Sequence, residues 1–187
     1  MGRADTAPGV AEVNLAQAFH NQAQSDFAIF GFLRDHGPPG MPECHPLHYL
    51  QMTVEKLSKA FVAAQGSEPP RSHEVFSRLL EMTGTRRYAE KLGYPNYRAY
   101  RGMLEGLIPL ARRVEELHPQ VPRVPPGLEK SNVEYPWRAR GDGNGEEWWS
   151  PATYAFGVLD ALRSPRGLQL LNHVRLLLVR FSEASRS

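Results

Sequence analysis

The chain has 187 residues, contains a single cysteine, Cys44, and carries a formal charge of +2 at neutral pH. This length is typical of one domain that buries its own hydrophobic core. One cysteine excludes an intrachain disulfide and a cysteine-built metal site, and the small net charge does not indicate strong attraction to nucleic acid or membranes. No apolar run approaches the roughly 20 residues that cross a bilayer, and the N-terminus lacks the apolar stretch of a signal peptide. We therefore expect a cytoplasmic protein without a membrane partner.

The first part of the chain shows helical periodicity in four segments. Apolar residues at helical spacing predict one helix over residues 14–34 and a second, better defined helix that ends at Gly66. Ser72 is the expected N-cap of a third helix. A fourth helix should begin after Asn96 and be kinked at Pro109, because proline removes a backbone donor inside a helix.

The periodicity disappears over residues 118–150, which are rich in proline, glycine and charge and are predicted to form a long loop. Four aromatic residues flank an Asp-Gly-Asn-Gly sequence in this segment: Tyr135, Trp137, Trp148 and Trp149. This pattern also fits a short β-hairpin with aromatic arms, and the alternative is a mobile flap whose tryptophans cover the bundle. Two further helices are expected at residues 151–162 and 165–183, because each begins with a Ser-Pro pair.

These elements predict an all-α fold, an up-and-down bundle of about six helices with one long aromatic loop or short β-hairpin near residues 118–150. We expect a single domain over residues 1–187, with a flexible N-terminus at residues 1–12 and residues 118–150 as a loop insertion. The last helix is apolar on nearly every side, so it should lie at the centre of the bundle or meet a second subunit.

The segment from Cys44 to Phe76 carries a further pattern. A helix with an aromatic residue near its start contains a Glu-Lys step, a second lysine and an alanine, and a turn with glycine and proline then leads to a Ser-His pair. The residues are Tyr49, Glu55-Lys56, Lys59-Ala60, Gly66, Pro69-Pro70 and Ser72-His73. In this order they resemble the core of HEPN domains, which implies a HEPN-like helical bundle. The family includes ribonucleases, toxins among them, and non-catalytic modules that bind nucleotides or assist partner nucleotidyltransferases.

The nuclease members of that family carry an arginine followed by a histidine near the start of a late helix. Arg166 and His173 fit the long end of this spacing, although Gly167 stands where the family usually has a polar residue. Two helical turns separate the pair, so Arg166 would steady a phosphate charge while His173 moves a proton of the RNA 2′-hydroxyl without a metal. Leu170 and Leu177 share the same face, so a histidine packed in the core or in a dimer seam is the alternative.

Two functional hypotheses follow from the resemblance. In the first, the chain is a HEPN-like binding or regulatory module for a nucleotide, nucleic acid or a protein partner, with a degenerate nuclease site. In the second, it is a metal-independent endoribonuclease of the toxin or defence type that uses Arg166 and His173 in the cleft of a homodimer. A third possibility is a bundle that binds an acyl group or another small molecule, with the tryptophan-containing loop as a lid.

The candidate residues for binding a nucleotide or phosphate are Lys56, Lys59 and His73. Each has a simpler explanation: Lys59 stands four residues after Glu55, which favours a solvated ion pair, and His73 would make a structural hydrogen bond at a helix start. No cofactor is expected. No metal site is expected either, because the closely spaced ligands Cys44, His45 and His48 lack a second ligand pair.

Overall fold

The computed structural model describes residues 14–73, 75–119, 131–140 and 145–185, and most residues within these ranges are helical. The α-helices are α1 (Leu15–His36), α2 (Cys44–Ala64), α3 (Phe76–Thr83), α4 (Arg86–Lys91), α5 (Tyr97–Glu115), α6 (Val158–Arg163), α7 (Pro165–Val179) and α8 (Phe181–Ala184). Strands β1 (Trp137–Arg140) and β2 (Glu146–Trp149) form an antiparallel hairpin, followed by the 3-10 helix η1 (Pro151–Thr153). The prediction of a helical bundle is confirmed. None of the described helices is long and apolar enough to cross a membrane.

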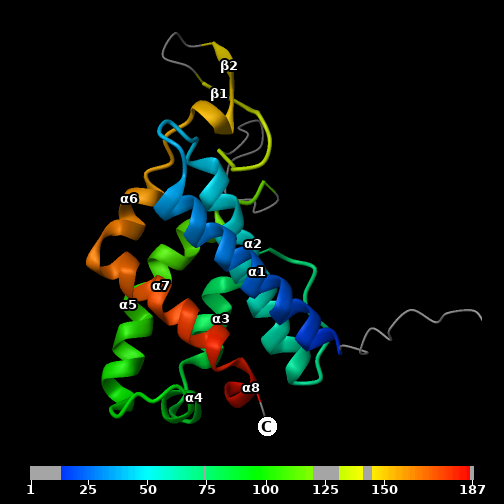
Figure 1. Cartoon of the computed structure of the whole chain (residues 1–187), viewed down its shortest axis with the longest axis vertical. Helices are drawn as coiled ribbons and strands as arrows, with labels where there is room; N and C mark the ends of the chain where they lie inside the picture. The colour runs from blue at the N-terminus through cyan, green and yellow to red at the C-terminus, as the bar shows by residue number, and fades with distance from the viewer. Residues whose placement is uncertain (1–13, 74, 120–130, 141–144, 186–187) are drawn as a thin grey trace, which may run out of the picture.

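The bundle is organised around the antiparallel pair α1 and α2, which lie side by side along most of their length (Figure 1). Helix α3 packs on α5, and α6 packs on α7. The hairpin lies at one end of the molecule, whereas α4 and α8 lie at the other (Figure 1). Fully buried side chains from five helices form the core: Phe30, Phe61, Leu80, Leu107 and Leu177. The apolar stripes of the sequence therefore meet in one core, and burial of this apolar surface is the main force that stabilises the fold.

Several helix ends lie where local sequence signals predict them. The Asn96 side chain accepts a hydrogen bond from the backbone N–H of Ala99 at 3.0 Å, and Ser164 accepts one from Gly167 at 3.1 Å. Gly66 follows the end of α2 with φ of +76°, a conformation that glycine adopts without strain. These three boundaries are confirmed because caps and glycine stops act within a few residues. Pro109 lies inside α5, which continues on both sides of it.

Other boundaries differ from the prediction. Ser72 is not the N-cap of α3, which begins later, at Phe76. The reason is tertiary, because the preceding segment turns His73 toward α2 instead of winding into a helix. The predicted helix over residues 165–183 is interrupted after Val179, and the break directs Phe181 onto other aromatic rings of the core.

The segment over residues 151–162 is helical only in part. Gly157 precedes α6 with φ of +62°, a left-handed conformation that ends any continuous helix at this point. Between η1 and Gly157, the Tyr154 ring packs against Trp137 with ring centroids 5.1 Å apart and against Phe156 at 5.0 Å. These aromatic contacts attach the chain to the hairpin and replace the predicted helix.

The hairpin alternative for the aromatic segment is confirmed. Trp137 pairs with Trp149 in its register, and Arg138 pairs with Trp148. Trp137 and its partner Trp149 lie on one face of the hairpin, and Trp148 lies on the other because adjacent side chains of a strand alternate between faces. Trp137 is buried, whereas Trp148 is 66% exposed. Residues 1–13, 120–130 and 141–144 lie outside the described residues, and with them the predicted flexible N-terminus and part of the predicted loop insertion.

Gly167 departs from the nuclease pattern for a packing reason. A Cβ atom at this position would overlap the carbonyl oxygen of Ala161 and the Cα of Leu162, both of them backbone atoms of α6. Only glycine allows the start of α7 to approach α6 this closely. The polar residue of the nuclease pattern does not fit here without movement of one helix.

Replacing Gly167 with alanine should therefore lower the free energy of unfolding by about 1–3 kcal/mol, the usual cost of overpacking. Gly102 provides the matched control, because it lies in α5 with nothing within 4 Å of an added Cβ. Gly102→Ala should raise the free energy of unfolding by up to about 1 kcal/mol through helix propensity. Urea titration followed by circular dichroism measures both effects, and equal shifts of the same sign would contradict the packing argument.

Candidate functional site

Several ionisable side chains of the described interior gather around Glu55 of α2. Glu55 is only 7% exposed. Lys59, one turn further along α2, donates to Glu55 Oε1 at 2.6 Å, and His73 Nδ1 donates to Glu55 Oε2 at 2.7 Å. Burial by itself raises the pKa of Glu55, but the hydrogen bonds from Lys59 and His73 outweigh it and hold the pKa below its usual value. Glu55 is therefore an ionised carboxylate whose two oxygens each accept a hydrogen bond.

His118 joins this group from the segment that follows α5. Its ring stacks on the ring of His73 with centroids 3.4 Å apart and an angle of 13° between the planes. Burial, and next the neighbouring His73, lower the pKa of His118 to about 4. At neutral pH, the imidazole of His118 is therefore uncharged.

Glu134 extends the group toward the surface near the hairpin. Its Oε1 lies 3.8 Å from His118 Nε2 and 3.8 Å from His48 Nδ1. The Asn132 side chain accepts hydrogen bonds from the backbone N–H groups of Glu134 and Tyr135 at 2.9 and 2.7 Å, which orders this turn. We call six side chains together the Glu55 cluster: His48, Glu55, Lys59, His73, His118 and Glu134.

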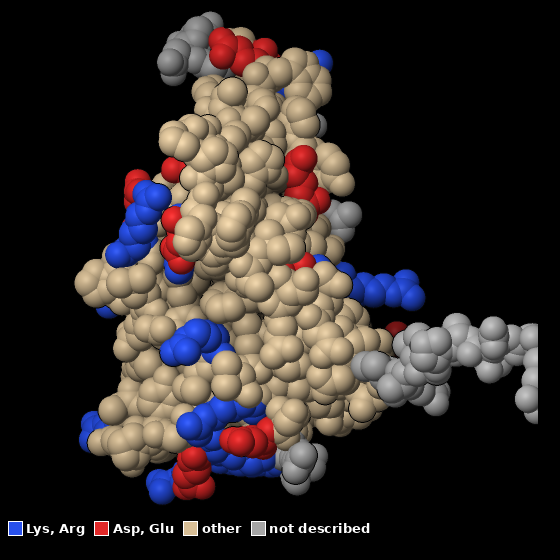
Figure 2. All heavy atoms as spheres, viewed as in Figure 1, with Lys and Arg blue, Asp and Glu red and all other residues tan. Residues whose placement is uncertain are grey.

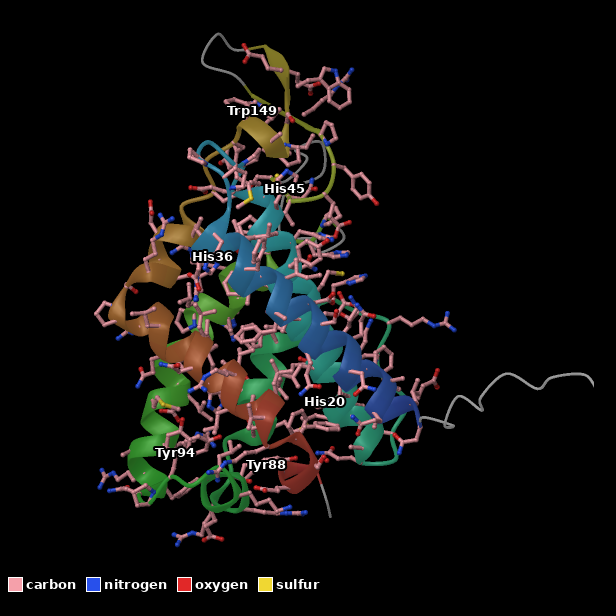
Figure 3. All side chains as sticks on the ribbon, viewed as in Figure 1. His20, His36, His45, Tyr88, Tyr94 and Trp149 are labelled. Atoms are coloured by element: carbon pink, nitrogen blue, oxygen red, sulfur yellow. The ribbon has the colours of Figure 1, made fainter. Side chains whose placement is uncertain are left out.

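A pocket of 560 Å³ opens beside this cluster, and we call it the α2 pocket. Its walls are the first turns of α2, residues 133–136 and residues 150–152. Figure 3 places His45 at the start of α2, close to the hairpin that carries Trp149. The chemically active side chains that line it are Cys44, His45, His48, Tyr49, Glu134 and Tyr135. The volume is typical of small-molecule sites, which combine apolar walls with a few polar groups.

A larger hollow, of 840 Å³, lies where the start of α1 meets the end of α2 and α8. Glu68 is the only ionisable side chain among its described lining residues. It lacks the convergent imidazole and carboxylate groups that chemistry requires, so we place the candidate site at the α2 pocket.

The three residues predicted to bind phosphate all contact carboxylates. Lys56 Nζ donates to Asp26 Oδ2 at 2.6 Å, and Lys59 and His73 both donate to Glu55. The predicted pair of Glu55 and Lys59 is confirmed, but it is buried rather than solvated. Two of the three residues thus lie in the Glu55 cluster, and their role in phosphate binding stays a prediction.

The predicted catalytic pair of α7 is not brought to one surface. Arg166 is exposed in the first turn, whereas His173 is 1% exposed and lies against the rings of Tyr94 and Tyr100, with centroids 6.3 and 5.9 Å away. Neither ring nitrogen of His173 has a hydrogen-bond partner among the described residues, and burial lowers its pKa to about 4. The face that carries His173 packs into the bundle with Leu170 and Leu177, which agrees with the core alternative. Catalysis by the pair stays a prediction.

The sequence interpretation missed His118 and Glu134. Both belong to residues 118–150, where the absence of periodicity predicts a loop, and neither stands at a recognisable spacing from Glu55. Composition offered one signal for Glu134, which is an acidic residue within the aromatic sequence Asn-Val-Glu-Tyr-Pro-Trp at residues 132–137. Cys44, His45 and His48, for which the sequence predicts no metal site, line the wall of the α2 pocket.

Comparisons with known proteins add no relative to this description. No protein-family model matches the chain, and neither a curated protein nor a solved structure is similar to it. The likeness to HEPN domains therefore rests on the motif residues between Cys44 and Phe76, and the candidate site is defined by its geometry.

Proposed function

We propose that this chain is a HEPN-like binding module that holds a nucleotide in the α2 pocket. The observation that carries the proposal is the pocket itself, which has a volume of 560 Å³ and brings two tyrosine rings and two imidazoles together next to a carboxylate. Ligand sites of this size enclose molecules as large as a nucleotide.

The aromatic walls suit a base. Tyr49 and Tyr135 line the pocket from different segments, and Tyr135 is 61% exposed. A large ring that is left exposed at a concave surface offers a flat face on which a base can stack. Stacking tolerates any base, so this part of the pocket would select nucleotides as a class.

The polar walls suit the sugar and the phosphate. His45 is exposed in the first turn of α2, where the helix dipole favours an anion. His48 lies one turn further in, and its buried Nδ1 has no hydrogen-bond partner among the described residues. Glu134 repels phosphate but accepts hydrogen bonds from a ribose hydroxyl or a base amino group. The base and the sugar-phosphate part of a nucleotide would therefore contact different side chains of the pocket.

Charge distribution favours a nucleotide over a long nucleic acid. On the face shown in Figure 2, the Lys and Arg side chains near α4 and α8 alternate with Asp and Glu. In that view the described residues form no continuous cationic stripe of the kind that follows a phosphate backbone. The net charge of +2 agrees with this choice.

The proposal is tested by isothermal titration calorimetry with AMP, GMP, CMP and UMP at moderate salt and with EDTA present. At least one should bind with a dissociation constant below about 1 mM. Tyr135→Ala should weaken binding by about 5- to 100-fold, because stacking on a ring contributes about 1–3 kcal/mol per base. Phe32→Ala is the matched control, since Phe32 is 62% exposed on α1 but does not line the pocket. No binding by any nucleotide, or equal effects of the two variants, would refute the proposal.

The endoribonuclease alternative keeps Arg166 and His173 as its pair and needs a second chain. Two apolar side chains of α7, Leu168 and Val179, are 50% and 70% exposed, which supports a homodimer contact on this helix. Because His173 is buried and does not face solvent, we favour nucleotide binding over this alternative.

A further inference from the structure

Glu55, His73 and His118 each offer one ligand atom, and these three atoms all lie within 4.8 Å of one another. We propose that they bind one divalent zinc ion. Two imidazoles and one carboxylate are a donor set that proteins use for zinc, with the fourth position left to water. The inference does not require nucleotide binding, because none of the three ligands lines the α2 pocket.

The two carboxylate oxygens of Glu55 have different partners. Oε2 faces His73 at 2.7 Å, whereas Oε1 accepts from Lys59 at 2.6 Å. A zinc ion held by Oε2 and His73 Nδ1 would replace that hydrogen bond, and the zinc-bound ring would carry its hydrogen on Nε2 alone. Lys59 would stay on Oε1 and hold the carboxylate in place, as outer hydrogen bonds do at metal sites.

The arrangement requires only small movements. Zinc–nitrogen and zinc–oxygen distances of about 2.0–2.2 Å place tetrahedral ligand atoms roughly 3.3–3.6 Å apart. The observed limit of 4.8 Å must therefore shrink by about 1.2–1.5 Å, and the 2.7 Å separation of Glu55 Oε2 and His73 Nδ1 must widen by about 0.6–0.9 Å. The nearly parallel rings of His73 and His118 must also tilt toward each other. His73 lies in an irregular, half-buried segment before α3, where such a rotation does not disturb a helix.

The charges near the three ligands also suit a cation. Glu55 and Glu134 place two carboxylates beside the imidazoles of His73 and His118, and Lys59 is the one lysine of the cluster. Glu134 Oε1 lies 3.8 Å from His118 Nε2, which is beyond hydrogen-bond distance but close enough for its carboxylate to favour a nearby cation. A divalent cation at the three ligands would interact favourably with both carboxylates.

The other candidate ligands do not converge in this way. Within the part of the chain that the structure describes, Cys44, His45 and His48 do not form a group of three ligand atoms this close together. Cys44 is 4% exposed and His45 points to an exposed position, so the sequence neighbours face different surroundings.

The test uses the full chain, stripped with EDTA, dialysed and titrated with zinc chloride by calorimetry. We expect one zinc ion per chain and a rise in melting temperature, since a ligand that binds the folded state stabilises it. His118→Gln and His73→Gln should each weaken zinc binding by at least tenfold. His36→Gln is the control, because His36 is exposed at the end of α1 and far from the cluster in sequence, and it should bind zinc like the parent chain.

Unchanged binding in folded His118→Gln, or no binding by the parent chain, would overturn the proposal. If both glutamine variants fail to fold, X-ray absorption spectroscopy of the zinc-loaded parent chain identifies the ligands of the ion. Two imidazoles and oxygen ligands are expected around the ion, and sulfur scattering would move the site to Cys44 and overturn the assignment. Nucleotide titrations contain EDTA, so failure of one proposal does not imply failure of the other.

Discussion

Replacing Glu55 with alanine should lower the free energy of unfolding by about 3–5 kcal/mol, the usual cost of removing one partner of a buried ion pair. The loss arises because Lys59 and His73 both donate to this carboxylate and stay largely buried without it. The measurement is urea unfolding at pH 7 followed by circular dichroism. EDTA must be present so that loss of a bound metal does not contribute to the difference.

Glu105 provides the matched control for this effect. It also pairs with a cation four residues away on a helix, Arg101, but the two side chains are 59% and 50% exposed. Glu105→Ala should therefore change the free energy of unfolding by no more than about 0.5 kcal/mol. If Glu55→Ala lowers the free energy of unfolding as little as Glu105→Ala does, the ion pairs of Glu55 contribute no more than a surface pair.

The second large effect concerns pH and His173. Burial lowers the pKa of His173 to about 4, whereas the unfolded chain has the ordinary value near 6.5. Between these two values the unfolded chain takes up a proton that the folded chain does not bind. Stability should therefore be complete above pH 6.5 and fall as the pH drops toward 4, by about 3 kcal/mol from this residue. His173→Leu should remove that part of the pH dependence.

The same substitution removes two ring nitrogens that lack hydrogen-bond partners among the described residues. His173→Leu should then raise the free energy of unfolding at pH 7 by about 1 kcal/mol or more, since a buried polar group without a partner is costly. Thermal melts from pH 4 to pH 8 measure both effects. His36→Leu is the control, because it removes a histidine that is exposed at the end of α1 instead of buried in the core. Parallel profiles for the parent chain and His173→Leu would contradict the argument.

His173→Leu also decides the ribonuclease alternative. The purified chain is incubated at high concentration with mixed RNA and EDTA. Because His173 lies in the core, we expect no cleavage by the parent chain or by the variant. Cleavage by the parent chain that the variant loses would establish Arg166 and His173 as a catalytic pair and make the endoribonuclease the leading hypothesis.

Local sequence signals are sufficient to predict the helical class, the hairpin alternative and several helix ends. Asn96 and Ser164 cap their helices, and Gly66 terminates α2, because these residues act on backbone groups only a few positions away. Apolar periodicity likewise identified the buried faces of α2 and α5, since it depends only on residues of the same helix.

The candidate site depends on tertiary packing. The sequence motif contains Glu55, Lys59 and His73, but His118 and Glu134 reach them only because α2, the segment before α3 and the chain after α5 converge. That convergence depends on how distant helices pack, which periodicity within one helix does not encode. Packing also displaced the predicted cap at Ser72, as His73 turns toward Glu55. It buried His173 away from Arg166 as well, because the face of α7 that carries Leu170 and Leu177 contributes more by entering the core than by facing solvent.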